Sequence, residues 1–373
     1  MTLPVADAAL HEALGAFPFG GRVAQAQLYG KGHINETYLV DIVLPNGQTR
    51  PFILQRINTH VFPDVVSLMG NIVGVTRHLQ QSISQTGGSP QREALTVIPA
   101  QNGSPFYTTA DGGAWRCYYF IQNTVCYQVA PNANVLYQAA RAFARFSLLL
   151  QDYPAETLRE TIPHFHDTPK RLADLQAAVA ADPMGRAHNC QSEIDFALQR
   201  QTDCFVLANH LSAGRLSLRV THNDTKLNNV LLDETSGEGV CIIDLDTVMP
   251  GLLLHDYGDS IRSGAHSASE DERDLGHVSF SLPYFEAYTK GYLEVLAPYL
   301  SPLEKELLPW GAKLMTLECG MRFLTDYLLG DTYFKIARPD HNLVRTRTQF
   351  KLVHDMEESW QKMQQTIARY TQP

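Results

Sequence analysis

The sequence predicts an α+β protein with two lobes, a small antiparallel β-rich lobe over residues 1–121 and a larger, mainly helical lobe over residues 122–373. Two observations predict this division. Strand-like segments separated by turn residues fill the first part of the chain, and apolar residues at helical spacing dominate the rest. The length of 373 residues also suits two lobes that share one cleft, since domains average about 150 residues.

The composition is that of a globular protein whose partners are small molecules. Of the residues, 44% are hydrophobic and 18% are charged, which supplies enough apolar material for a buried core. The formal net charge of −9 and the lack of any Lys/Arg cluster argue against nucleic-acid binding. No apolar run approaches the length of about 18 residues that a membrane span needs.

The cysteines and the first residues favour a cytoplasmic location. The six cysteines are scattered without a C-x-x-C pair, so neither a zinc site nor a disulfide framework is expected. Residues 1–20 carry no Lys or Arg, whereas a secretory signal peptide begins with a basic stretch. A monomer is favoured, and the sequence leaves the oligomeric state open.

Three antiparallel strands are expected near the start of the chain. Residues 25–29 and 37–44 have strand character on either side of the turn Gly30-Lys31-Gly32, and residues 51–57 form the third strand. The turn Pro45-Asn46-Gly47 joins the last two strands, because Asn-Gly supplies the positive φ angles of a tight hairpin.

Further elements follow from periodicity and from helix-start residues. Residues 65–81 have helical spacing, residues 96–107 and 114–121 read as strands, and a strand–loop–strand is expected within residues 218–243. At Ser301-Pro302-Leu303-Glu304 a long helix begins, because Ser and Glu at this spacing cap each other's backbone. Its apolar stripe comprises Leu307, Trp310, Leu314, Leu317, Met321, Leu324 and Leu328.

The segment from Val220 to Asp246 carries the candidate chemistry. Asp224 lies in a loop five residues before Asn229, which opens an apolar strand, and a second strand ends in Asp244. In phosphoryl transfer one carboxylate orients the acceptor hydroxyl and takes its proton, while an amide oxygen and a second carboxylate hold Mg²⁺. We therefore expect Asp224 to be catalytic, Asn229 and Asp244 to bind Mg²⁺, and ATP to be the phosphoryl donor.

Two other residues of this segment have candidate roles. Asp246 is the less favoured alternative to Asp244 as a metal ligand, and Lys226 is expected to contact a γ-phosphate oxygen as a point charge. Each residue alone also fits a polar turn between strands. The ordered combination H-x-D-x-x-x-x-N, an apolar strand and I-I-D favours the catalytic interpretation.

These residues resemble the catalytic and metal loops of the aminoglycoside phosphotransferase-like kinases, a family related to the protein kinases. Residues 250–259 resemble the family's segment after the metal aspartate, in which Asp256 matches an aspartate that stabilises the loop. The resemblance implies a protein-kinase-like fold and the use of ATP and Mg²⁺. It also implies an adenine site at the hinge, with Ile121 as a nucleotide-binding residue.

A narrower resemblance is to the bacterial N-acetylhexosamine 1-kinases. It implies an ATP-dependent sugar kinase that phosphorylates the anomeric hydroxyl of GlcNAc or GalNAc, with His33, Arg322 and Tyr333 binding the sugar together with Asp224. The preference between these sugars stays open, because they differ in the orientation of one hydroxyl group. The blocks that carry the resemblance are residues 29–38, 52–58, 221–232, 244–251 and 320–334.

Two segments of the first lobe are candidates for phosphate contact. Gly30 and Gly32 belong to a turn where a kinase-like lobe covers the nucleotide with backbone N–H groups. Within residues 51–57, where kinases place a phosphate-pairing lysine, this chain has Gln55 and Arg56, of which only one faces the cleft. Arg56 has the required charge and is the expected contact, although Gln55 aligns better with the family's basic position. No glutamate partner is evident on the following helix.

Alternative interpretations stay open for single residues and for the function. Arg322 lies four residues after Glu318, which also fits a surface ion pair on a helix. His164 and His166 fit a polar loop better than a metal site, because no third ligand has plausible spacing. The alternative functions are a sister kinase for an aminoglycoside, homoserine, choline or methylthio-sugar, and a catalytically silent kinase-like binding module.

Overall fold

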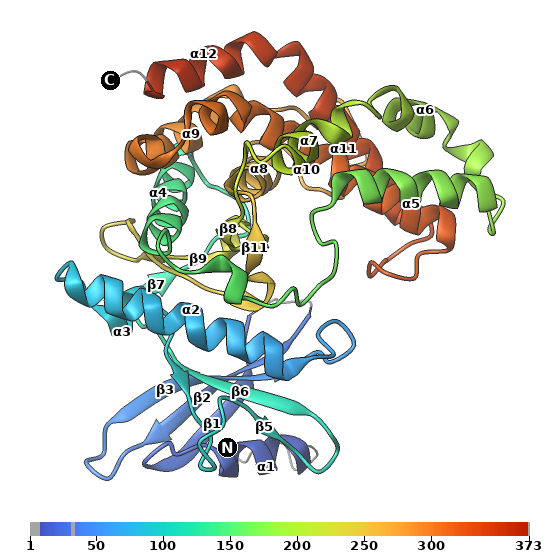
Figure 1. Ribbon diagram of the computed structural model, residues 1–373. Coiled ribbons are helices and arrows are strands. Elements are labelled where there is room, and N and C mark those ends of the chain that lie inside the picture. Colours follow the sequence, from blue (N-terminus) through green and yellow to red (C-terminus); the bar gives the residue numbers. More distant parts are fainter. Residues whose placement is uncertain (1–7, 31–33, 372–373) are drawn as a thin grey trace.

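A computed structural model describes residues 8–30 and 34–371 of the chain. The chain folds into a smaller lobe built on a β-sheet and a larger lobe built mainly from helices (Figure 1), which confirms the predicted α+β division. Among the residues that the structure describes, six strands form the sheet of the smaller lobe, in the order β1-β2-β3-β6-β4 with β5 also paired to β6. They are β1 Arg22–Leu28, β2 Glu36–Val43, β3 Thr49–Ile57, β4 Val97–Ile98, β5 Tyr107–Thr108 and β6 Ala114–Tyr119.

The first three strands are those that the sequence predicts, and they are antiparallel. At the turn between β2 and β3, the N–H of Leu44 donates to the carbonyl oxygen of Gln48 at 2.9 Å. Gly47 has a φ of 82°, the left-handed conformation that this turn requires. β3 also pairs with β6, in a register that sets Gln55 opposite Arg116. Residues directly opposite each other share one face of a sheet, so these two side chains are neighbours.

The two faces of the sheet are covered by different elements. On the outer face, Leu54 of β3 and Trp115 of β6 pack in one apolar cluster with residues of α1 (Ala8–Ala16). On the other face, Ile57 packs in a second cluster with α2 (Val65–Gln85) and with residues of the larger lobe. Because successive strand residues point to opposite faces, Gln55 and Arg116 lie on the face toward the larger lobe. We call this sheet with α1, α2 and α3 (Pro90–Glu93) the N-lobe, and the remainder the C-lobe.

Two small sheets of the C-lobe lie beside α2 (Figure 1). One is the antiparallel sheet β10-β9-β7 and the other is the antiparallel pair β11-β8. They contain the strand–loop–strand that the sequence predicts. Their strands are β7 Thr124–Val125, β8 Arg219–Thr221, β9 Val230–Asp233, β10 Gly239–Ile242 and β11 Met249–Gly251.

Helices make up the rest of the C-lobe. The long helix α10 begins with the predicted capping box, in which Ser301 Oγ accepts from the N–H of Glu304 at 3.1 Å and Glu304 Oε2 accepts from the N–H of Ser301 at 2.8 Å. The α-helices are α4 Ala133–Leu149, α5 Thr168–Ala181, α6 Gln191–Gln199, α7 Val206–Ser212, α8 Leu253–Gly264, α9 Leu282–Leu296, α10 Pro302–Leu329, α11 His341–Glu358 and α12 Trp360–Thr371. The 3-10 helices are Ala155–Thr157, Ala187–Asn189, Asp203–Phe205, Leu227–Asn229, Leu245–Thr247 and Ala297–Tyr299.

Helices α8 and α10 cross at a close approach that needs glycine on both sides. A Cβ atom on Gly258 would lie 2.2 Å from the carbonyl oxygen of Gly311, and a Cβ on Gly311 would lie 2.4 Å from that of Leu254. The backbones therefore touch directly. This contact fixes the position of α8, which carries Asp256 and Asp259 at the base of the candidate site.

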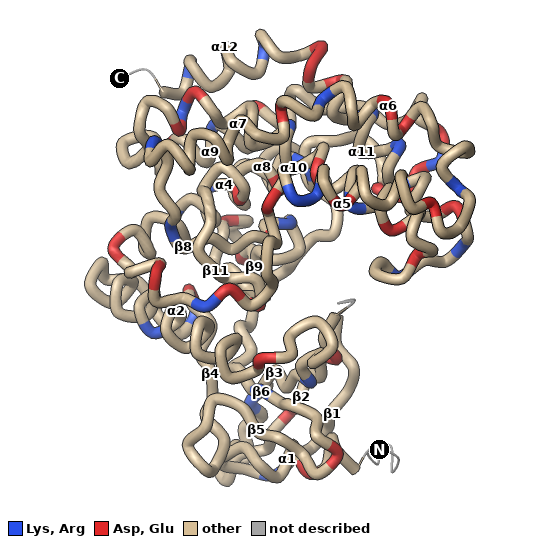
Figure 2. Tube along the Cα trace, turned by 45° about the vertical axis from the view of Figure 1, so that its right-hand side comes forward, with Lys and Arg blue, Asp and Glu red and all other residues tan. Residues whose placement is uncertain are grey.

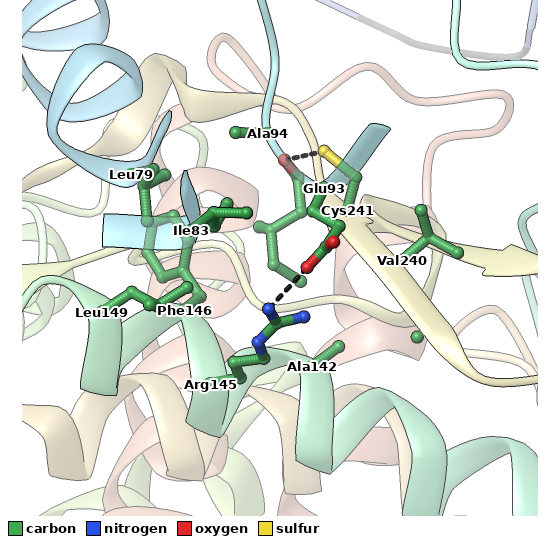
Figure 3. A pocket seen from close by; sticks show the side chains of 12 residues that line it. Leu79, Ile83, Glu93, Ala94, Ala142, Arg145, Phe146, Leu149, Val240 and Cys241 are labelled. Atoms are coloured by element: carbon green, nitrogen blue, oxygen red, sulfur yellow. Dashed lines mark hydrogen bonds and ion pairs between the residues drawn. The ribbon is translucent and has the colours of Figure 1, made fainter. Parts of the chain in front are cut away.

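A small cavity lies between α2, α3, α4 and β10. Figure 3 shows its apolar lining, with Leu79, Phe146 and Cys241, and the ion pair of 2.5 Å between Arg145 and Glu93 that ties α4 to α3. Its volume of about 30 Å³ is comparable to the space that one water molecule takes in the liquid, far less than the volume of a sugar or nucleotide site.

Charged residues of both signs are interspersed over the two lobes (Figure 2). Within the described residues, no helix has the length and the apolar character needed to cross a membrane.

Candidate active site

Two carboxylates of α8 accept hydrogen bonds from the backbone of the loop between β8 and β9. The backbone N–H groups of His222 and Asn223 donate to the Asp256 carboxylate at 2.8 and 2.7 Å. The N–H of Thr225 donates to Asp259 Oδ2 at 2.8 Å. Asn223 has a φ of 63°, a strained conformation that these bonds stabilise. Asp256 thus makes hydrogen bonds that stabilise the loop, as the sequence resemblance implies. Asp259 also stabilises the loop, which the sequence analysis did not predict.

Asp224 follows this strained residue and is held by two neighbours. Its Oδ1 lies 2.7 Å from Lys226 Nζ, and its backbone carbonyl oxygen accepts from Asn229 Nδ2 at 2.8 Å. Burial opposes ionisation of Asp224, but the Lys226 ammonium outweighs burial and lowers the pKa of the carboxyl below its ordinary value. At neutral pH the side chain is therefore a carboxylate, the form that accepts a proton from a hydroxyl group.

Asn229 and Asp244 come together through a backbone hydrogen bond. The N–H of Ile243, which precedes Asp244, donates to the carbonyl oxygen of Asn229 at 2.9 Å. Asp244 has a φ of 60°, and its side chain reaches solvent, but the protein around the carboxylate still reduces its hydration. Burial within the protein, and then the carboxylates of Asp246 and Asp224, raise the pKa of Asp244 to about 6. Carboxylates that repel one another in this way are stabilised by a divalent cation.

These residues fit a Mg²⁺ ion that is shared with a nucleotide. Among the described residues, no group of three or more His, Cys, Asp or Glu side chains is arranged to hold a metal by itself. Mg²⁺ takes only one or two protein oxygens when phosphate oxygens and water complete its octahedron. The carboxylate of Asp244 and the amide oxygen of Asn229 supply such a pair.

Asp246 has a different environment and links the lobes. Its Oδ2 accepts from Asn35 Nδ2 at 2.6 Å, and its Oδ1 pairs with Arg116 Nη1 of β6. Both carboxylate oxygens of this buried residue are thus bound to N-lobe side chains. This arrangement favours Asp244 over Asp246 as the metal ligand. Arg116 lies outside the sequence blocks that carry the family resemblance; Asn35 lies within residues 29–38, but the sequence analysis gives it no role.

Arg56 does not lie on the cleft side of the sheet, in contrast to the expectation from its charge. It is on the outer face with Trp115, where its guanidinium lies 5.8 Å from the ring centroid and its Nη2 pairs with Asp111 at 2.6 Å. Gln55 is the residue that faces the cleft, where its Oε1 accepts from Arg116 Nε at 3.0 Å. Strand alternation permitted either orientation, and the packing of the outer apolar cluster decides between them.

Tyr29, which precedes Gly30, contacts the hinge. The ring of Tyr29 meets the ring of Phe120 edge-on, with 5.7 Å between centroids. Ile121 is buried, and its carbonyl oxygen accepts from Thr124 Oγ1 at 2.9 Å. Gly30 has a φ of 80°, whereas Gly32 and His33, the other candidates of this turn, lie outside the described residues.

Arg322 of α10 lies among aromatic rings and does not form the alternative ion pair with Glu318. Its guanidinium carbon is 5.5 Å from the centroids of Phe165 and Phe334 and 5.7 Å from that of Tyr333. Its Nη2 donates to Tyr333 Oη at 3.4 Å. Arg322 and Tyr333 are thus in contact, and their predicted role in sugar binding stays a prediction. We call these four side chains the Arg322 cluster.

The Asp326 carboxylate accepts hydrogen bonds from the loop that carries Tyr333 and Phe334 of the Arg322 cluster. Asp326 Oδ1 accepts from the N–H of Tyr333 at 2.8 Å, and Asp326 Oδ2 accepts from the N–H of Phe334 at 2.9 Å. Asp326 is itself buried in α10, one turn after Arg322. The arginine and the loop that meets it are therefore positioned by the same helix.

Glu318 has partners that the sequence did not predict. Its Oε1 lies 3.0 Å from His166 Nδ1, and its Oε2 accepts from Thr168 Oγ1 at 2.6 Å. The other ring nitrogen of His166 lies 2.9 Å from the carbonyl oxygen of Asn223. Both histidines lie in a loop before α5, as predicted; within it the His166 side chain is buried and bridges α10 and the catalytic loop, whereas the His164 side chain is exposed. These contacts join residues 57 and 152 positions apart, which no local pattern signals.

The fold and this set of residues define a class of protein, a two-lobed phosphotransferase of the kinase type with an ionised aspartate beside a candidate magnesium site. The phosphotransferase enzyme family (APH) matches residues 25–299, well over half of the chain, and the chain belongs to this family. The nucleotide and metal of the family are ATP and Mg²⁺.

Solved structures with the same fold are kinases for various small molecules. An aminoglycoside phosphotransferase from Alicyclobacillus acidocaldarius has a TM-score of 0.58 at 12% identity, covering 99% of this chain and 98% of that one. A microcompartment-associated aminopropanol kinase has a TM-score of 0.56 at 15% identity, covering 95% and 98%. An amicoumacin kinase in complex with AMP-PNP and Ca²⁺ has a TM-score of 0.56 at 14% identity, covering 92% of each chain. The fold is therefore that of the small-molecule kinases.

Proposed function

We propose that this protein transfers the γ-phosphoryl group of ATP to the anomeric hydroxyl of an N-acetylhexosamine, giving the sugar 1-phosphate. The observation that carries the proposal is the Arg322 cluster, a hydrogen-bonding guanidinium set among three aromatic rings. Arg322 lies on the same helix as Glu318, which reaches the catalytic loop through His166. Sugar sites commonly combine such donors with aromatic faces, which pack against the apolar side of a pyranose ring.

In this reaction the acceptor oxygen attacks the γ-phosphorus as the bond to the ADP oxygen breaks. The proton of the anomeric hydroxyl passes to the Asp224 carboxylate, which Lys226 and the backbone bond from Asn229 hold in place. An anomeric hydroxyl is more acidic than other sugar hydroxyls, because the ring oxygen stabilises its alkoxide, so a modest base suffices. Mg²⁺, held by Asn229 and Asp244, would neutralise charge on the phosphates.

Charge near the Arg322 cluster favours a neutral acceptor over a cationic one. Burial, and then the positive charge of Arg322, lower the pKa of Arg171, and the carboxylates of Glu318 and Asp174 only partly oppose this effect. Aminoglycosides, choline and aminopropanol carry positively charged amines, which an acidic pocket would suit better. An uncharged N-acetylhexosamine meets no such repulsion.

Phosphorus-31 NMR of the protein with ATP, Mg²⁺ and either GlcNAc or GalNAc tests the proposal. We expect a new sugar 1-phosphate resonance that couples to the anomeric proton and is absent with Asp224→Asn. A phosphorylated product from choline or an aminoglycoside, with none from either sugar, would replace the proposal with a sister kinase. The absence of turnover with every acceptor, and of ATP hydrolysis, would indicate a silent binding module.

A further inference from the structure

We propose that Arg116 supplies the cation that pairs with the phosphates of bound ATP, and that Asp246 orients it. This inference rests on the proposed kinase function. It assigns the role of phosphate-pairing cation to a residue of β6, because β3 has no cation that faces the cleft. Gln55 stands where a cleft-facing cation is expected on β3, and Arg56 points to the opposite face.

The sheet directs Arg116 into the space between the lobes. Its neighbours on β6, Ala114 and Tyr118, pack in the apolar cluster that extends into the C-lobe, whereas Trp115 and Cys117 pack in the outer cluster. The side chain of Arg116 is only 1% exposed and lies directly across from Gln55, whose Oε1 accepts from its Nε. The guanidinium therefore occupies the position next to the one that a β3 lysine would fill.

Asp246 is the carboxylate that pairs with Arg116. In protein kinases a glutamate from a helix pairs with the β3 lysine and holds it toward the phosphates. Here the partner of Arg116 comes from the C-lobe, two residues after the candidate metal ligand Asp244. Asn35 holds the second oxygen of Asp246 at 2.6 Å, so the carboxylate is fixed from two sides.

The chemistry of the pair also points to a functional role. Removing an ion pair from water costs a large desolvation free energy, so a buried ion pair is often no more stabilising than apolar residues of the same volume. Arginine stays charged in any protein environment, and its planar fork offers five N–H groups that match the oxygens of a phosphate. The charge of Asp244 acts on Arg116, so this cation lies near a residue that would hold Mg²⁺.

Binding of ligands with and without phosphates tests this assignment. We would measure the affinities of MgADP and of adenosine by calorimetry for the wild type and for Arg116→Gln. The loss of a charge-assisted hydrogen bond predicts a roughly 10- to 100-fold weaker MgADP complex, with adenosine affinity unchanged within about twofold. Arg116→Lys, which keeps the charge, should recover part of the loss.

Three comparisons keep the result interpretable. The double variant Arg116→Gln/Asp246→Asn leaves no unpaired buried charge, so it tests the same loss if the single variant unfolds. Arg56→Gln examines the rival arginine and should leave MgADP affinity unchanged. Equal MgADP affinity of wild type and the folded double variant, or a loss with Arg56→Gln alone, overturns the inference but leaves the kinase proposal intact. A wild type that binds no MgADP overturns both.

Discussion

Nε2 of His166 lies 2.9 Å from the backbone carbonyl oxygen of Asn223, the residue immediately before the candidate catalytic aspartate. Its Nδ1 lies 3.0 Å from Glu318 Oε1. Both partners accept hydrogen bonds, so the ring makes both bonds only when each of its nitrogens carries a proton. Burial lowers the pKa of His166, but the hydrogen bond and negative charge of Glu318, together with the hydrogen bond to the Asn223 carbonyl and the charge of Asp259, outweigh burial and raise the pKa above its ordinary value.

Because of this geometry, we expect His166→Gln to remove a pH-dependent part of the stability. A raised folded-state pKa means that the His166 contribution to the free energy of unfolding is complete below about pH 6.5 and is lost as the pH rises through the folded-state value. The contribution of Glu318 to the free energy of unfolding depends on pH in the opposite direction. Burial raises the pKa of Glu318, but the hydrogen bond and charge of His166, the hydrogen bond from Thr168 and the charge of Arg322 together lower it below 4.5, so the Glu318 contribution is lost only as the pH falls below that value.

Urea unfolding of the wild type and His166→Gln at about pH 5 to 9 checks this prediction. The difference in the free energy of unfolding should shrink as the pH rises above 6.5. His60→Gln, at an exposed position, is the matched control and should show no such trend. A wild-type-to-variant difference that stays constant over the range would contradict the doubly protonated ring.

Replacement of Asp224 by asparagine should abolish turnover without unfolding the protein. The substitution keeps the shape of the side chain but removes the base, so kcat should fall by roughly 10²- to 10⁴-fold while KM for ATP changes little. Asp195→Asn, on the exposed surface of α6, is the control that should keep full activity. Steady-state kinetics with circular dichroism of both variants decides; retained turnover in folded Asp224→Asn would rule out its role as base.

Gly258→Ala should destabilise the protein through the crossing of α8 and α10. The added Cβ would lie 2.2 Å from the carbonyl oxygen of Gly311, and overpacking of this kind typically costs about 1–3 kcal/mol. Gly70→Ala, at an open position of α2, should instead be neutral or stabilising by up to about 1 kcal/mol, since alanine is the better helix former. Thermal and urea unfolding measure the stability of each variant. Equal stabilities of Gly258→Ala and Gly70→Ala would show that α8 and α10 can move apart without cost, which would contradict the prediction.

Substitution of Arg322 by glutamine should weaken sugar binding selectively. Loss of its hydrogen bonds and of its contacts with Phe165 and Tyr333 should raise KM for the acceptor sugar roughly 3- to 10-fold, with KM for ATP unchanged. Arg369→Gln, an exposed residue of α12, serves as the control. If both Michaelis constants rise together, the Arg322 cluster supports the fold and makes no acceptor site.

Local sequence patterns determined the secondary structure and the core of the catalytic loop. The Asn-Gly turn set the β2–β3 hairpin, and the Ser301–Glu304 spacing set the start of α10, because such preferences act over a few residues. The spacing of Asp224, Asn229 and Asp244 likewise predicted a loop and two strands, which the structure contains. These features depend on neighbours in the chain, which the sequence displays directly.

Only the tertiary structure decided which side chains meet across the two lobes. Arg116 pairs with Asp246 over a separation of 130 residues, and His166 with Glu318 over 152. The two-residue period of β3 separates Gln55 from Arg56 but does not say which face meets the cleft; that depends on the packing of α1 and α2 against the sheet. The cation of the cleft therefore comes from β6, because burial of the outer apolar face turns Arg56 away.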